Sequence, residues 1–158
     1  MKLNNKNIII ILTFLLIISA NANVIYAQNE TTFEKTSNSL GFNGGFGGNG
    51  ISYRHYFSDK NSIQLTGSIY SNYDGEVNFN GGALYRRVIH QRKRTRLLIS
   101  SGFSFNNYSQ SLGSVLEVEI NPVWMDNIST SISTGYQIST RNTGNIGPIM
   151  NVSLFYNF

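Results

Sequence analysis

Few residues of this chain could carry acid–base or nucleophilic chemistry. The 158 residues include two histidines, His55 and His90, and no cysteine. A nucleophilic serine on a strand needs its base either two positions away on the same strand or at the paired position of the neighbouring strand. Only these positions share a face of the sheet at hydrogen-bond distance. Neither histidine has a serine two positions away. The sequence therefore predicts a protein that is not an enzyme, with no metal site and no cofactor.

Two acidic residues are more informative, because they stand in an alternating apolar run. Glu117 and Glu119 alternate with apolar residues, so both carboxylates leave a strand on the face opposite the apolar one. A strand over 115–124 would place Glu119 nearer the middle of the strand. Glu117 would then lie closer to the strand end that is expected on the outer side of a membrane. If the apolar face meets lipid, the glutamates point inward and need cationic partners. The arginines on inward faces of their own predicted strands are Arg54, Arg86 and Arg96.

The arrangement of these five residues supports two interpretations. Packed together, they would form a plug of ion pairs, with at least one arginine hydrogen-bonded to Glu119. Spaced along a water-filled interior, they would line a narrow path for ions. If the chain forms eight strands that close into a barrel, the plug of ion pairs is favoured, because the interior of such a barrel is only wide enough for side chains to fill it.

A basic cluster lies around the predicted turn at 90–94, where Arg92, Lys93 and Arg94 follow one another. A solvated turn with arginines reaching toward a membrane edge is the first interpretation. Contact with anionic lipid head groups or with a periplasmic polymer is the second. The net charge is only +4, and Lys2 and Lys6 supply two of these charges, so nucleic acid is not an expected partner.

The elements that position these residues are predicted to be strands. After residue 38, apolar residues recur at every second position, and turns rich in Gly, Asn and Asp separate the runs. No helical periodicity occurs there. The predicted strands cover 39–46, 51–57, 63–70, 77–86, 96–105, 115–124, 128–138 and 146–158, with 110–114 as a loop.

Eight alternating strands predict an all-β fold, an antiparallel up-and-down transmembrane β-barrel over 39–158. Closure leaves no unpaired strand edge, and the low content of charged residues, 13%, suits an outer wall in lipid. A soluble β-sandwich alternates in the same way and is the rival fold. Aromatic residues near strand ends are expected to form two belts, with Tyr53, Phe57, Trp124 and Tyr156 on the periplasmic side and Phe46, Phe105 and Tyr136 on the outer side.

The first 27 residues read as a cleaved secretory signal peptide. Lys2 and Lys6 precede an apolar core over 8–18 that is too short to span a bilayer as a helix. Cleavage could follow Ala22 or Ala27, and residues 28–38 form a polar periplasmic lead-in. The domain organisation is thus 1–27, 28–38 and 39–158.

The final strand and one earlier segment carry a family resemblance. Residues 50–60, Gly-Ile-Ser-Tyr-Arg-His-Tyr-Phe-Ser-Asp-Lys, and 151–158, Asn-Val-Ser-Leu-Phe-Tyr-Asn-Phe, resemble the small eight-stranded outer-membrane barrels of the OmpA and OmpX type and uncharacterised short outer-membrane β-barrel proteins. In that class a final apolar strand ending in Phe is an insertion signal. The matching residues here are Leu154, Tyr156 and Phe158.

The resemblance implies a location and a class more than an activity. It implies a monomeric protein of the outer membrane of a Gram-negative bacterium, with outer-membrane lipids and the barrel assembly machinery as partners. The expected role is a non-enzymatic envelope scaffold or surface-interaction protein with a plugged lumen. A porin-like narrow channel for small solutes or ions is one alternative, and a lipid A-modifying barrel enzyme is another.

Overall fold

The computed structural model describes residues 38–71, 74–139 and 146–158 of the chain. The predicted signal peptide and all but the last residue of the lead-in lie outside these ranges. The strands are β1 (Asn38–Gly44), β2 (Gly50–Tyr56), β3 (Asn61–Ser71), β4 (Val77–Arg92), β5 (Thr95–Asn106), β6 (Ser109–Ile120), β7 (Ile128–Ser139) and β8 (Ile146–Asn157).

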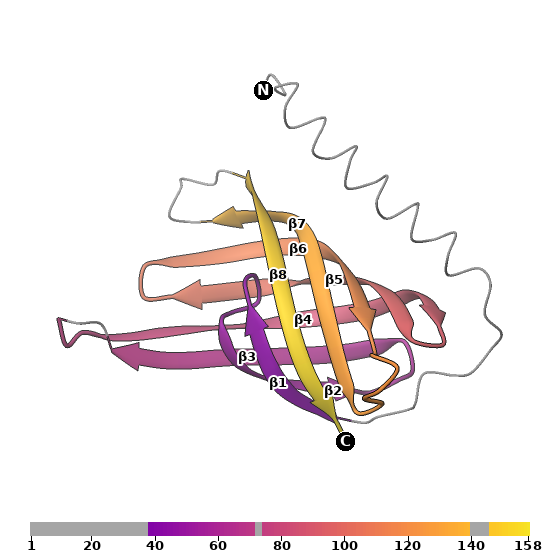
Figure 1. Ribbon diagram of the computed structural model, residues 1–158. Helices are drawn as coiled ribbons and strands as arrows, with labels where there is room; N and C mark the ends of the chain where they lie inside the picture. Colours follow the sequence, from indigo (N-terminus) through magenta and orange to yellow (C-terminus); the bar gives the residue numbers. More distant parts are fainter. Residues whose placement is uncertain (1–37, 72–73, 140–145) are drawn as a thin grey trace, which may run out of the picture. The chain divides into compact units, whose positions relative to one another are not determined.

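These strands form one closed antiparallel barrel in which each strand pairs with its neighbours in sequence (Figure 1). β1 pairs with β8, from Ser39 opposite Asn157 to Gly44 opposite Val152, and this pairing completes the ring. The predicted fold class, an all-β eight-stranded antiparallel barrel, is confirmed. Within the three described ranges, no helix is long and apolar enough to cross a membrane.

The two ends of the barrel carry different connections. The connections β2–β3, β4–β5 and β6–β7 lie at one end, here called the turn end, where β1 begins and β8 ends. The connections β1–β2, β3–β4, β5–β6 and β7–β8 lie at the other end, the loop end. The β3–β4 hairpin points to the left in Figure 1 and marks the loop end.

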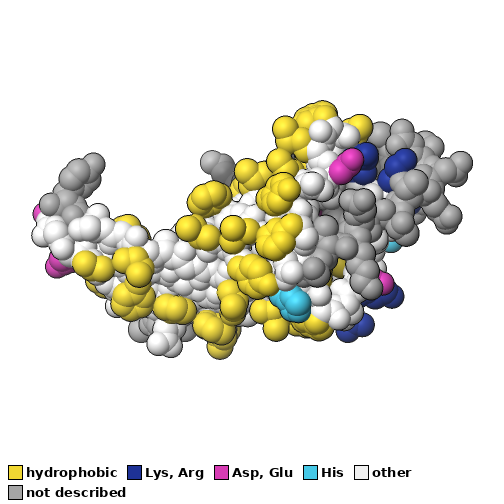
Figure 2. Space-filling view, turned by 90° about the horizontal axis from the view of Figure 1, so that it is seen from below, with side chains coloured by type: hydrophobic (Ala, Val, Ile, Leu, Met, Phe, Trp, Pro, Cys, Tyr) yellow, Lys and Arg dark blue, Asp and Glu magenta, His cyan; other side chains and the backbone are white. Residues whose placement is uncertain are grey.

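The alternation of side chains is inverted relative to a barrel with an apolar core. Large apolar side chains point outward: Phe42 is 63% exposed, Ile69 80% and Val152 61%. Small polar side chains point inward and are buried, among them Ser52, Gln64, Thr66, Ser129, Ser133 and Asn151. Figure 2 shows the result on one face, where hydrophobic side chains form a band over the wall.

Both predicted boundaries of the sixth strand are wrong. Residues 110–114 lie within β6, because the turn forms earlier: the Asn106 side-chain Oδ1 accepts hydrogen bonds from the backbone N–H groups of Tyr108 (2.8 Å) and Ser109 (2.9 Å). At its other end β6 stops at Ile120 rather than reaching Trp124. Pro122 has no N–H to pair with a neighbouring strand, and its carbonyl instead accepts from Met125 N at 3.2 Å in a turn.

Candidate functional site

The candidate site is a set of three arginines and two glutamates inside the barrel toward the turn end, here called the lumen charge cluster. Each is at most 5% exposed, and Arg54 and Arg86 are fully buried. Alternation alone sends these side chains inward, and closure of the ring brings β2 and β4 to face β6. The members are Arg54 on β2, Arg86 on β4, Arg96 on β5, and Glu117 and Glu119 on β6.

The two glutamates share two arginines. Arg54 Nη1 lies 2.6 Å from Glu119 Oε1 and Arg86 Nη2 lies 2.6 Å from Glu117 Oε1. A second bond from Arg86 Nε to Glu117 Oε2, 3.1 Å, makes that pair bidentate, and Arg86 Nη2 also reaches Glu119 Oε2 at 3.4 Å. Two adjacent carboxylates would repel each other, and the guanidinium groups between them remove that repulsion.

Arg96 takes a different place from the other two arginines. The salt bridges to Glu117 and Glu119 in the described residues come from Arg54 and Arg86. The Arg96 guanidinium instead lies 5.5 Å from the centre of the Tyr56 ring, in cation–π geometry. All five predicted residues therefore meet in the lumen, but with distinct roles.

Four further residues complete the cluster and were not predicted as part of it. Phe155 is 1% exposed, and its ring centre lies 3.8 Å from the Arg54 guanidinium carbon. Arg54 also donates to Gln64 Oε1 at 3.1 Å and to Tyr56 Oη at 3.0 Å, while Ser100 Oγ donates to Glu117 Oε2 at 3.0 Å. The alternation of inward and outward positions along each strand could have identified these residues, since each of them occupies an inward position of its strand.

The expected position of Glu119 along its strand is wrong. Because β6 ends at Ile120, Glu119 stands one residue from the strand end and Glu117 is nearer the middle. The cluster therefore closes the lumen near the turn end, and a different group of residues fills it toward the loop end.

That second group is apolar and is built around Phe46. The sequence predicts Phe46 on the outer wall, but β1 ends at Gly44 and Phe46 folds into the barrel, where it is only 3% exposed. It packs with two inward-facing residues, Leu84 and Val115, and with the partly buried Ile149. We call Phe46, Leu84 and Val115 the Phe46 plug.

Hydrogen bonds hold the β1–β2 connection inside the barrel. Asn151 of β8 accepts from Phe46 N and donates its Nδ2 to Phe46 O at 3.0 Å. Asn43 Nδ2 donates to Gly48 O at 2.6 Å, and Ser153 Oγ donates to Asn43 Oδ1 at 2.7 Å. The inward turn requires glycine at Gly47, where φ is +84° and an added Cβ would lie 2.6 Å from Leu84 Cγ.

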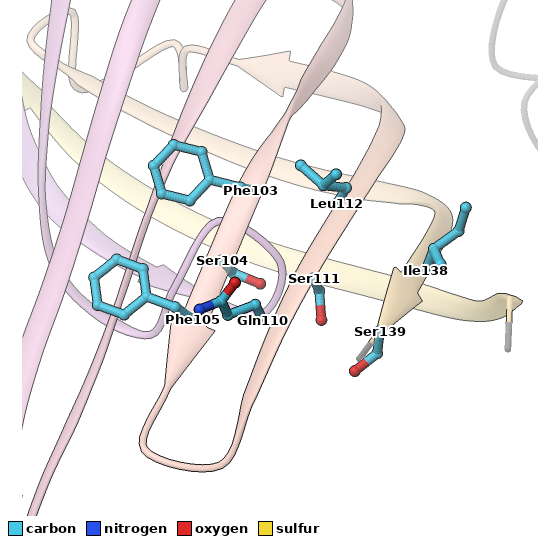
Figure 3. Close-up of a pocket in the computed structure, with 8 residues that line it drawn as sticks. All are labelled: Phe103, Ser104, Phe105, Gln110, Ser111, Leu112, Ile138 and Ser139. Atoms are coloured by element: carbon cyan, nitrogen blue, oxygen red, sulfur yellow. The ribbon is translucent and has the colours of Figure 1, made fainter. Parts of the chain in front are cut away.

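Above the Phe46 plug, the loop end opens into a polar hollow of about 260 Å³. A larger hollow of about 570 Å³ adjoins it on β5, β6 and β7 (Figure 3). Figure 3 shows Phe103 and Phe105 projecting to the same side of β5. Among the described residues that line the two hollows, none is acidic, basic or histidine.

The other residues singled out in the sequence lie outside the lumen. Arg92 is the last residue of β4, and Lys93 and Arg94 form the turn, where Arg94 Nη1 lies 3.2 Å from Asp126 Oδ1. Leu154, Tyr156 and Phe158 are on the outer wall, 50%, 54% and 57% exposed. Both histidines are exposed, and His90 lies in β4 rather than in a turn.

Metal binding has no candidate in the described part of the chain, which holds no group of three or more acidic or histidine side chains suited to an ion. Comparisons with protein-family models, with curated proteins and with solved structures find no match for this chain. The class that the fold and the lumen define is a small closed eight-stranded β-barrel with a polar interior filled by side chains.

Proposed function

We propose that this protein is a monomeric barrel of the bacterial outer membrane that serves as a non-enzymatic envelope scaffold or surface-interaction protein. The observation that carries the proposal is the wall of exposed apolar side chains around a buried polar interior. Soluble monomers rarely expose contiguous apolar patches larger than a few hundred Å². A closed barrel with this wall satisfies its backbone within the ring, as a bilayer requires.

Export and insertion complete the proposal. The basic and apolar start of the chain suits a cleaved signal peptide. The barrel assembly machinery would recognise the last strand through Leu154, Tyr156 and Phe158, which are exposed on the outer wall of the barrel. The resemblance to the OmpA and OmpX type of barrel points in the same direction.

The first test concerns location. Expressed in a Gram-negative host, the full chain is expected in the outer-membrane fraction, and it should migrate differently on a gel before and after boiling, because closed barrels resist detergent until heated. Purified protein in planar bilayers is expected to show no conductance above baseline. Recovery of the protein in the soluble periplasm would contradict the membrane proposal.

A narrow channel is the second candidate, and the charges in the lumen favour it. Three arginines and two glutamates line the interior, and rings of charge select ions in known pores. The filling of the lumen argues against a channel. The lumen charge cluster and the Phe46 plug both consist of buried side chains, and they fill the lumen at two different levels. Stepwise conductance from the wild-type protein would make the channel the better proposal.

Orientation can be tested with single cysteines, because the chain has none of its own. Asp74 lies at the loop end and Lys60 at the turn end. We expect Asp74→Cys to react with a membrane-impermeant maleimide on intact cells, and Lys60→Cys to react only after the outer membrane is opened. The opposite pattern would invert the proposed topology while leaving the barrel in the membrane.

A further inference from the structure

A bulge in β4 changes which side chains reach the outer wall at the turn end. β4 pairs with β5 in register up to Val88 opposite Leu98, and pairing resumes with His90 opposite Leu97, leaving Ile89 as the extra residue. Directly paired residues place their side chains on the same face of the sheet. A one-residue shift therefore exchanges the inward and outward sets beyond the bulge.

The consequence is that two arginines of β4 share the outer face. Arg87 pairs with Ile99 and Arg92 pairs with Thr95, and both partners belong to the outward set of β5. Without the bulge, Arg87 and Arg92 would point to opposite faces, because five positions separate them. His90 lies between them on the same face, and Arg92 Nε donates to its Nε2 at 3.3 Å.

Two lysines add to this positive surface. The β2–β3 turn lies against β4 there, since Val88 N donates to Lys60 O at 2.7 Å, and Lys93 follows Arg92 directly. Both lysines are exposed. Lys60, Arg87, Arg92 and Lys93 are named here the β4 basic patch. In Figure 2, Lys and Arg side chains are seen at one end of the barrel, beyond the hydrophobic band.

Asp59 is the acidic residue next to Lys60 in the β2–β3 turn. The surface salt bridge at the turn end joins Arg94 to Asp126. Arg87, Lys60 and Lys93 have no carboxylate within 4.0 Å in the part of the chain that the structure describes. An excess of cationic donors at one edge of an apolar wall complements a ligand that is anionic at one end and apolar at the other.

The wall beside the patch supplies the apolar half of such a site. Ile89 is 48% exposed and Ile99 46%, and Ile99 stands directly across from Arg87. Tyr85 and Phe57 stack nearby with ring centres 6.3 Å apart, the arrangement of an aromatic belt at an interface. Guanidinium groups bind phosphate oxygens through paired N–H donors.

We propose that the β4 basic patch binds the phosphate of an anionic phospholipid in the leaflet at the turn end, with the acyl chains along Ile89 and Ile99. This inference rests on the proposed membrane location. A zwitterionic lipid carries its own cation beside the phosphate and gains less from the patch. The site is therefore selective for a net negative head group.

The test uses the full chain in a neutral detergent, with native mass spectrometry to count retained lipids. Phosphatidylglycerol is expected to bind about tenfold more tightly than phosphatidylcholine at equal chain length. The double variant R87Q/R92Q should reduce that preference to about twofold or less. R87K/R92K keeps the charge without the paired donors and should retain an intermediate preference.

The matched control is R94Q, which removes one charge from the same turn. Because Arg94 already pairs with Asp126 and with Pro122 O at 2.9 Å, its loss should change the preference by less than about twofold. Equal binding of both lipids by the wild type, or an effect of R94Q as large as that of R87Q/R92Q, would overturn the inference. So would inorganic phosphate that binds as tightly as the lipid. A protein that never enters membranes would instead refute the proposed function.

Discussion

Replacing Glu119 with leucine is expected to destabilise the folded barrel by about 3–5 kcal/mol, because the change leaves a buried arginine without its anion. Arg54 is fully buried, and its shortest ionic contact is the 2.6 Å bond to Glu119. The second carboxylate, Glu117, lies 4.0 Å from Arg54 Nη2 and already forms a bidentate pair with Arg86. It cannot serve both arginines equally well.

Thermal and denaturant unfolding in detergent micelles measure this effect. The control is Glu76→Leu, an exposed carboxylate near the loop end, which should shift stability by no more than about 0.5 kcal/mol. The double variant Arg54→Met/Glu119→Leu removes both partners and should recover much of the loss, since the arginine that paired with Glu119 is removed with it. An unchanged midpoint for Glu119→Leu would mean that the ion pair does not stabilise the barrel.

Replacing Phe46 with alanine is expected to cost about 3–5 kcal/mol, the usual range for deleting a buried phenyl ring. Phe46 is 3% exposed and fills the lumen against Leu84 and Val115. Little nearby structure can collapse into the space, because the surrounding wall is a closed ring of strands. The same unfolding measurements apply.

Phe42 provides the matched control, since it lies four residues earlier, within β1, but faces outward and is 63% exposed. Phe42→Ala should cost clearly less than Phe46→Ala. Conductance of the Phe46→Ala protein should stay at baseline, because the lumen charge cluster still closes the other part of the barrel. Equal costs for the two variants would contradict the inward position of Phe46, and new conductance would contradict closure by two layers.

The two closures differ in what they contribute physically. The Phe46 plug is apolar and gains from burial without any need for charge balance. The lumen charge cluster holds charges that are costly to bury, and its stability depends on near-complete pairing.

Strand phase was available from the sequence. Alternation along β6 is enough to send Glu117 and Glu119 to one face, and the same argument places Arg54, Arg86 and Arg96 inward. The count of eight strands followed from runs of alternation separated by turn residues. These features are local, because a strand's period of two is a property of its own backbone.

Pairing across the lumen was decided only by the tertiary structure. Arg54 and Glu119 are 65 positions apart on strands that do not adjoin, so closure of the ring determines that they meet. Phe46 continues the outward alternation of β1, and only the glycine-rich connection, folding inward onto Leu84, reverses its direction. The bulge at Ile89 likewise moves Arg92 to the outer face. Each outcome depends on register and closure, which involve residues far apart in the chain, and periodicity within one strand carries no information about them.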